Sequence, residues 1–127
     1  NTRSRGLGDV YKRQGFSVVM TSDHGSIRVQ NDVMVSADRT ASSGVRYKYG
    51  RNINTSPKNA LVIRDPKEYR LPEFGPQPTY VIAKNDNYFV YPNDAHKYQG
   101  KFSNSFQHGG ISMEEMIVPI AIMESRL

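Results

Sequence analysis

An apolar run that leads into an Asp-His-Gly triplet limits how this chain can fold. Residues 16–20 read Phe-Ser-Val-Val-Met, and Asp23, His24 and Gly25 follow two residues later. This composition predicts a buried strand of an α/β sheet, and such sheets bind ligands beyond the carboxyl ends of their strands. Because neighbouring residues on a continuing strand point to opposite faces, Asp23 and His24 can share a metal only if the chain turns, which Gly25 permits. The competing interpretation is an ordinary strand-end Asp beside a surface His.

A second histidine with glycine neighbours lies near the other end of the chain. His108 precedes two glycines, which allow the backbone to approach a metal or a substrate closely. Ser112 and Glu115 have the S-x-x-E spacing of a capping box, which predicts a short helix directly after the glycines. The apolar run 116–123 then predicts a final strand, with its proline at position 119 on an edge or at a bulge.

Together the two histidine segments resemble those of PglZ domains, a branch of the alkaline phosphatase superfamily. The segments are Met20-Thr21-Ser22-Asp23-His24-Gly25-Ser26 and Phe106-Gln107-His108-Gly109-Gly110-Ile111-Ser112-Met113-Glu114-Glu115-Met116-Ile117-Val118-Pro119. The resemblance runs from about Phe16 to Ser125 and is nearest to the PglZ domain of PorX-type response regulators, known from Bacteroidetes with type IX secretion. It implies an α/β fold in which this chain is the C-terminal part of an alkaline phosphatase-like sheet that carries an inserted antiparallel β subregion.

The resemblance also implies a metal site. In that superfamily two metal ions, usually zinc, flank a Thr or Ser nucleophile that attacks phosphorus. By resemblance, Asp23 and His24 hold the metal nearest the nucleophile, and His108 belongs to the other metal. The nucleophile and the remaining ligands lie upstream in the family, so residues 15–127 are expected to be only the C-terminal portion of the domain. A catalytic zinc normally has three protein ligands, so a chain with three ligands for two metals is expected to be inactive by itself.

The activity implied for the full-length parent is zinc-dependent phosphohydrolysis, as a phosphodiesterase or phosphatase acting on cyclic or linear oligonucleotides. The same resemblance implies a cytoplasmic response regulator of a two-component system, with an upstream receiver domain and signalling partners. It leaves open whether the protein forms a homodimer. Two alternatives remain. One is a PglZ module that acts as a non-catalytic signalling scaffold, which an intact upstream nucleophile would disfavour. The other is a metal-dependent phosphomutase of the same superfamily, which also uses an Asp-His-Gly motif but resembles this chain less in its final segment.

Basic and aromatic residues alternate in the segment 45–51. On a strand, Arg46 and Lys48 fall on one face and Tyr47 and Tyr49 on the other. One interpretation is that Arg46 or Lys48 binds a substrate phosphate while a tyrosine stacks on a base. The other is an amphipathic strand whose tyrosines pack inward while its charges stay in water.

Turn signals organise the rest of the insertion. The β-type runs within 26–35 predict a strand pair, and the runs 79–84 and 87–91 flank an Asn-Asp pair and predict a hairpin. His96 lies in the polar stretch 93–98. That stretch predicts a loop, and the absence of a glycine-bearing turn beside His96 favours a solvated side chain over a ligand.

Residues 1–14 differ from the rest of the chain. They contain four basic residues and one acidic residue without a sustained apolar period, and their end resembles the translation of a transposase adaptor used in sequencing-library preparation. We therefore predict a non-native, disordered leader whose deletion is harmless. The alternative is a basic arm that binds nucleic acid.

Excluding that leader changes the inference from charge. The 127-residue chain has a net charge of +5, but residues 15–127 contain 13 basic and 11 acidic residues, or +2. The charge by itself then no longer argues for a nucleic-acid partner. The chain has no cysteine, which excludes a disulfide framework and a thiolate zinc site. Because no apolar run approaches the roughly 20 residues that span a bilayer, we expect no membrane partner.

Overall fold

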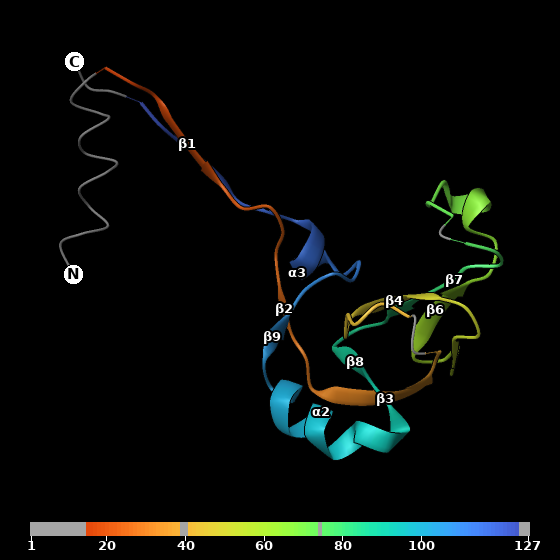
Figure 1. Cartoon of the computed structure of the whole chain (residues 1–127). Coiled ribbons are helices and arrows are strands. Elements are labelled where there is room, and N and C mark those ends of the chain that lie inside the picture. Colours follow the sequence, from red (N-terminus) through yellow and green to blue (C-terminus); the bar gives the residue numbers. More distant parts are fainter. Residues whose placement is uncertain (1–14, 39–40, 74, 125–127) are drawn as a thin grey trace.

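The computed structural model describes residues 15–38, 41–73 and 75–124. They form a body of short strands and helices, from which a two-stranded ribbon projects (Figure 1). Strands predominate, and the helices are few and short. This content is consistent with part of an α/β fold.

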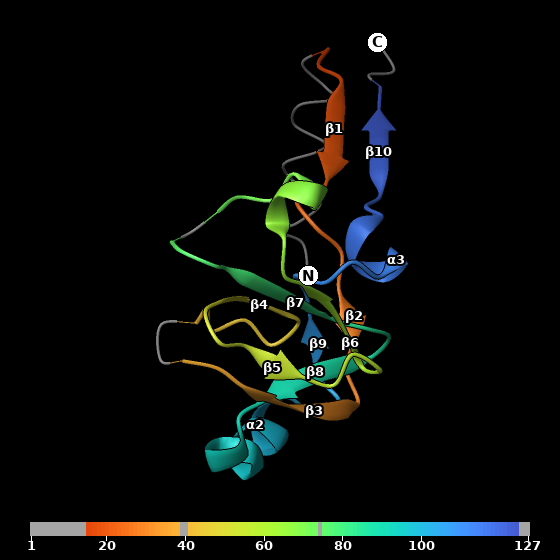
Figure 2. The same ribbon diagram turned by 90° about the vertical axis from the view of Figure 1, so that its right-hand side faces the viewer.

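The projecting ribbon joins two segments that are far apart in the sequence. Strand β1 (Val18–Thr21) runs antiparallel to β10 (Ile120–Met123), with Val18 opposite Met123 and Thr21 opposite Ile120. The two strands lie side by side in both views (Figures 1 and 2). Both predicted strands are therefore present, and the second begins directly after the proline at position 119.

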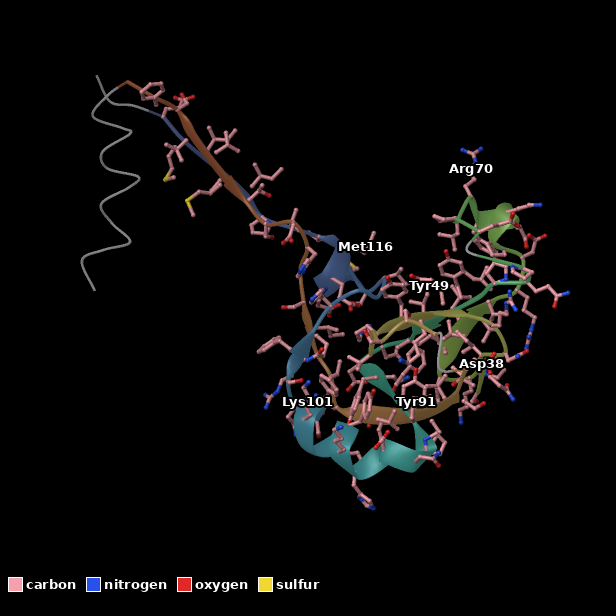
Figure 3. All side chains as sticks on the ribbon, viewed as in Figure 1. Asp38, Tyr49, Arg70, Tyr91, Lys101 and Met116 are labelled. Carbon is pink, nitrogen blue, oxygen red and sulfur yellow. The ribbon has the colours of Figure 1, made fainter. Side chains whose placement is uncertain are left out.

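The prediction that the first strand is buried is wrong for this structure. Val19 and Met20 are 60% and 59% exposed, and Ile120 and Ile122 on the partner strand are 69% and 66% exposed. Side chains stand out from both faces of the ribbon (Figure 3). The apolar, β-branched sequence favours a strand, but burial also requires a covering layer. Within the described ranges these apolar side chains stay exposed, so no element covers them.

The body contains three small sheets. The first pairs β2 (Ile27–Arg28) with β9 (Phe106–Gln107). The second has the strand order β5 (Asn54–Thr55), β3 (Asn31–Ser36) and β8 (Asn87–Val90). The third has the order β4 (Tyr47–Gly50), β7 (Thr79–Ala83) and β6 (Ala60–Ile63). The helical elements are η1 (Pro66–Tyr69), η2 (Pro92–Asp94), α2 (Ala95–Phe102) and α3 (Met113–Met116). The predicted antiparallel β subregion is present in the third sheet. The second sheet is mixed, because β3 and β8 run parallel.

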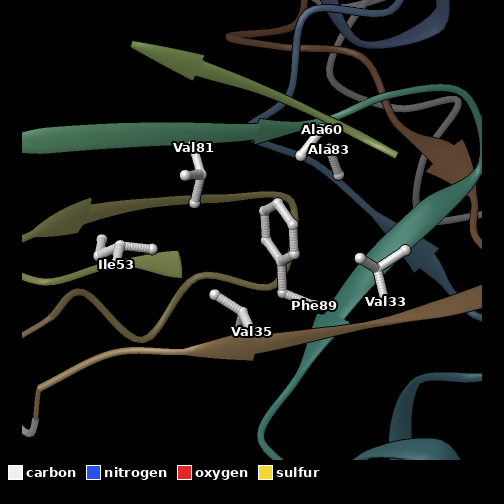
Figure 4. Packing of buried hydrophobic residues seen from close by; sticks show 7 residues of the cluster. All are labelled: Val33, Val35, Ile53, Ala60, Val81, Ala83 and Phe89. Atoms are coloured by element: carbon white, nitrogen blue, oxygen red, sulfur yellow. The ribbon is translucent and has the colours of Figure 1, made fainter. Parts of the chain in front are cut away.

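The core lies between the second and third sheets. On β3 the side chains alternate, so Val33 and Val35 are buried while Met34 is 48% exposed, as expected for a strand with one face on a core. The buried cluster comprises Val33, Val35, Ile53, Ala60, Val81, Ala83 and Phe89 (Figure 4). Burying a side chain of the size of Val or Phe contributes about 1.5–3 kcal/mol, so this cluster anchors the insertion.

The predicted hairpin is wrong, although its turn is present. Asn85 adopts a left-handed conformation with φ of 50°, and the Asn87 N–H donates to the Lys84 carbonyl at 3.1 Å. The two strands then separate, because β7 pairs with β4 and β6 while β8 pairs with β3. All four residues of β8 are buried, and contacts from distant segments outweigh the local turn. The predicted pairing within 26–35 is wrong for the same reason, since β2 pairs with β9.

The segment around His96 also differs from its predicted loop. It forms helix α2, whose Tyr98 and Phe102 pack on a second buried cluster that includes Tyr88 and Val90. The spacing of four between Tyr98 and Phe102 places both on one helix face, a signal that the polar composition obscured. His96 itself is exposed, in agreement with a solvated side chain. None of the described helices is long and apolar enough to cross a membrane.

Candidate functional site

The two glycine-flanked histidines lie against each other. The ring centroids of His24 and His108 are 3.9 Å apart, and the rings are inclined by only 13°. Both side chains are exposed. The fold therefore brings together two residues that are separated by 84 positions in the sequence.

A short antiparallel ladder brings the histidines together. Strand β2 follows His24 and strand β9 precedes His108, and Ile27 is paired with Gln107 across the ladder. The two histidines thus lie just beyond the same end of this pair of strands. Helix α3 lies at the junction between the ribbon and the body (Figure 1), where the Gly25 N–H donates to the Glu115 carbonyl at 2.9 Å.

Asp23 lies directly beside the His24 ring. Its carboxylate is 88% exposed, and Oδ1 is 3.7 Å from His24 Nε2. The same oxygen accepts the His24 backbone N–H at 3.1 Å. His24 Nδ1 is 2.8 Å from the Gly25 carbonyl, so in the tautomer with the proton on Nδ1 the ring donates there and keeps its Nε2 lone pair free. This is the usual arrangement by which a second contact fixes a histidine ligand.

The distance between Asp23 and His24 fits shared zinc ligation. Two ligand atoms on one tetrahedral zinc lie about 3.4 Å apart, close to the 3.7 Å between Asp23 Oδ1 and His24 Nε2. The described part of the chain contains no group of three or more His, Cys, Asp or Glu residues able to hold a metal. A complete metal site is therefore absent from the described residues.

The interpretation that Arg46 or Lys48 binds a substrate phosphate is contradicted by the burial of both side chains. Both residues have no exposed surface. Arg46 donates through Nε and Nη2 to the Glu115 carboxylate at 2.9 and 2.8 Å, and through Nη1 to the Asn87 carbonyl. Lys48 donates to the Ser42 carbonyl at 3.2 Å, and its Nζ lies 4.4 Å from the centroid of the Tyr91 ring. Neither cation is open to a ligand.

Burial changes the chemistry of Lys48. Removal from water penalises the charged ammonium and lowers the pKa of Lys48 to about 8. The charged residues of this segment therefore face the interior, and the alternative interpretation, in which the charges stay in water, is wrong as well.

Tyr47 occupies the outer face of this strand, beside the candidate site. Its side chain is 36% exposed, and it stacks on Tyr49 with ring centroids 6.3 Å apart. A Cβ built on Gly109 would lie 3.2 Å from Tyr47 Cδ1, so the Tyr47 ring lies against the residue that follows His108. Of the two tyrosines available for stacking, Tyr47 is the one at the histidine loop.

Glu115 is the residue of this region whose wider role the sequence did not reveal. Helix α3 begins after Ser112 as predicted. The Glu115 half of the capping box forms, because the Ser112 N–H donates to Glu115 Oε2 at 3.2 Å, whereas Ser112 Oγ has no hydrogen-bond partner among the described residues. The same carboxylate also accepts the Gly110 N–H at 2.9 Å and both Arg46 bonds. Burial alone would raise the pKa of Glu115, but the hydrogen bonds from Arg46, Gly110 and Ser112 and the charge of Arg46 outweigh it and lower the pKa to about 2. Glu115 is therefore ionised at neutral pH.

A cleft of about 550 Å³ adjoins the loop that follows His108. Its lining includes Ile82, Lys84, Ile111 and Glu114. This cleft is open, and it provides space for an organic group next to the loop.

Comparison with known proteins identifies one family. The sequence model described as the BREX system PglZ alkaline phosphatase-like domain matches residues 7–123. No curated protein matches the chain. The matched range includes both histidine segments and the whole insertion between them.

Proposed function

The chain belongs to the PglZ family of alkaline phosphatase-like domains, and on this premise we propose that it contributes Asp23, His24 and His108 to the two-zinc site of a phosphohydrolase. The observation that carries the proposal is the contact between the two histidine rings, 3.9 Å apart. The carboxylate of Asp23, 3.7 Å from His24 Nε2, supports it. Exposed imidazole and carboxylate groups that converge from distant segments are the ligands that zinc prefers in a site without cysteine.

The role of each residue follows from its contacts. His24 keeps Nε2 available because Nδ1 is directed at the Gly25 carbonyl. Asp23 and His24 together would hold one ion, and His108 would hold the second. When bound, a zinc pair stabilises the attacking and leaving oxygens of phosphoryl transfer. Three ligands are too few for two catalytic ions, so the active site requires further ligands and a nucleophile beyond the described residues.

The proposed substrate class is a phosphodiester that carries an aromatic base, such as a cyclic or linear oligonucleotide. Tyr47 supports this choice, because it places a partly exposed aromatic ring against Gly109, next to His108. Base stacking on an aromatic side chain is tolerant of sequence. Arg46 and Lys48 do not support the choice, since both are buried and already paired.

A second candidate function is that of a signalling scaffold that binds partners without turnover. It is favoured by the incomplete ligand set, since the described stretches hold no group of three or more metal-ligating side chains. Membership of a PorX-type response regulator with a receiver domain would suit this role. That finer assignment rests on the likeness of the two histidine segments, with the insertion between them, to those of PorX-type PglZ domains.

Zinc binding by the chain tests the proposed site. We expect titration calorimetry to show weak zinc binding that is lost in Asp23→Ala and His24→Ala and reduced in His108→Ala. The matched control is His96→Ala, because His96 is exposed on α2 and away from the pair. Equal zinc binding by the His24→Ala variant and the unmodified chain would contradict the proposal.

Hydrolysis separates the enzyme from the scaffold. A longer protein that contains this chain and supplies a Thr or Ser nucleophile should hydrolyse bis-p-nitrophenyl phosphate and a short oligonucleotide in the presence of zinc. The same protein with His24→Ala should be inactive, whereas His96→Ala should retain activity. Zinc binding without any turnover by the longer protein would favour the scaffold.

A further inference from the structure

We infer that Glu115 and Arg46 are positioning residues that hold the two histidine loops in register. The zinc-dependent part of this inference rests on the proposed function, whereas the geometric part does not. Glu115 is 3% exposed and Arg46 has no exposed surface. Neither residue is available to a ligand, so any effect on the site must act through the loops that they contact.

Glu115 contacts both loops at once. Its backbone carbonyl accepts the N–H of Gly25, the residue after His24, at 2.9 Å. Its side chain accepts the N–H of Gly110, two residues after His108, at 2.9 Å. A displacement of Glu115 would therefore move the two histidine loops relative to each other.

Arg46 fixes Glu115 to the body. The guanidinium binds both carboxylate oxygens, at 2.9 and 2.8 Å, a bidentate geometry that restrains the direction of the carboxylate. Its third donor binds the Asn87 carbonyl at the start of β8, and the Arg46 carbonyl accepts the Ala83 N–H at 2.8 Å. The buried core is thus connected through Arg46 and Glu115 to both loops.

The space around the pair gives independent support. A Cβ on Gly110 would lie 2.5 Å from Glu115 Oε2 and 2.9 Å from Arg46 Nη2. A side chain at position 110 would push the pair away from the loop. The backbone after His108 therefore approaches the ion pair as closely as a glycine allows, which matches a role in holding this loop.

The cost of burying two charges argues in the same direction. Replacing a buried ion pair by apolar residues of similar volume is often neutral or stabilising. Stability alone is therefore a weak reason for Arg46 and Glu115 at this place. Their hydrogen bonds to Gly110 and Asn87 supply what an apolar pair cannot, namely a fixed position for the loop backbone.

The double substitution Arg46→Met with Glu115→Met separates positioning from stability. Apolar side chains of similar volume should preserve the fold, but they offer no acceptor for the Gly110 and Ser112 N–H groups. We expect the nuclear Overhauser contacts between the His24 and His108 rings to disappear in the folded variant. Zinc affinity should fall roughly 10–100-fold, the usual effect of removing a group that orients a ligand.

Two further variants complete the experiment. Glu115→Gln keeps an oxygen acceptor for Gly110 and should weaken the ring contacts less than the double Met variant does. Glu114→Gln is the matched control, because Glu114 is the exposed neighbour on the same helix, and it should leave ring contacts and zinc affinity unchanged. A folded double Met variant with unchanged ring contacts would overturn the inference. If the unmodified chain binds no zinc but the double variant loses its ring contacts, the zinc proposal fails and the positioning role stands.

Discussion

Substituting Gly25 by alanine should force the two histidine loops apart. A Cβ at this position would lie 2.0 Å from the Glu114 carbonyl oxygen, 3.0 Å from its carbon and 3.2 Å from the Ile117 carbonyl oxygen. All three neighbours are backbone atoms, so no side-chain rotation can relieve the overlap. An ordinary carbon–oxygen contact requires a movement of more than about 1 Å between the Gly25 turn and helix α3.

The expected cost follows from two terms. Overpacking of this kind typically costs about 1–3 kcal/mol. The movement also stretches the hydrogen bond from Gly25 N to the Glu115 carbonyl, whose loss costs about 1 kcal/mol. We therefore expect Gly25→Ala to lower the free energy of unfolding by roughly 2–4 kcal/mol. The same movement should separate the His24 and His108 rings.

Hydrogen exchange and thermal unfolding measure this effect. The Gly110 amide, which donates to Glu115, should lose protection in Gly25→Ala, and the unfolding midpoint should fall by about 10 °C. The matched control is Gly100→Ala, because a Cβ on Gly100 in helix α2 meets nothing within 4 Å. That variant should be neutral or more stable by up to about 1 kcal/mol. Equal Gly110 protection in the two variants would refute the reasoning.

Three further outcomes are expected. The pKa of Glu115 is lowered from 4.5 to about 2, so its stabilisation is present above pH 4.5 and is lost as the pH falls toward 2. Urea unfolding at pH 6 and pH 3 should show a loss on the order of 2 kcal/mol that Glu115→Gln lacks. The pKa of Lys48 is lowered from 10.5 to about 8, so the unfolded state binds more protons above pH 8. Stability should then rise from pH 8 to about pH 9.5, and Lys48→Met should abolish that rise. Tyr47→Ala should weaken binding of a short oligonucleotide in fluorescence anisotropy by about 5-fold or more while Tyr47→Phe does not, and an abasic oligonucleotide should show no difference.

The two histidine loops were predictable because their signals are local. Each histidine is recognised from its own neighbours, because each directly precedes a glycine. The S-x-x-E spacing likewise predicts the start of α3 from four residues. The ring contact between His24 and His108 then follows from the pairing of β2 with β9. The ligand roles of these residues remain predictions, and the leader at residues 1–14 lies outside the described residues.

The errors share a different physical cause. The hairpin prediction was wrong because β7 and β8 each pair with strands that are distant in sequence. The burial of the whole strand β8 contributes more than a favourable turn does. The exposure of β1 has the same origin, since composition favours a strand but cannot specify which layer covers it. Periodicity also placed Arg46 and Lys48 correctly on one face. It could not show that this face is the interior, because the partner of Arg46 is 69 positions away.

Glu115 shows how a correct local prediction can hide a wider role. The predicted capping box accounts for its contact with the Ser112 N–H and requires no other residue. A capping glutamate, however, is normally exposed and needs no cation, whereas the side chain of Glu115 is 1% exposed and bound to Arg46 at 2.8 Å. A buried carboxylate must be compensated, so Glu115 requires a cation from the core. The alternation at 45–51 contains that cation. The ion pair between Glu115 and Arg46 therefore links two separate sequence signals. On the positioning role inferred above, the distance between the histidines depends on Arg46 of the insertion as well as on Glu115 of the second histidine segment.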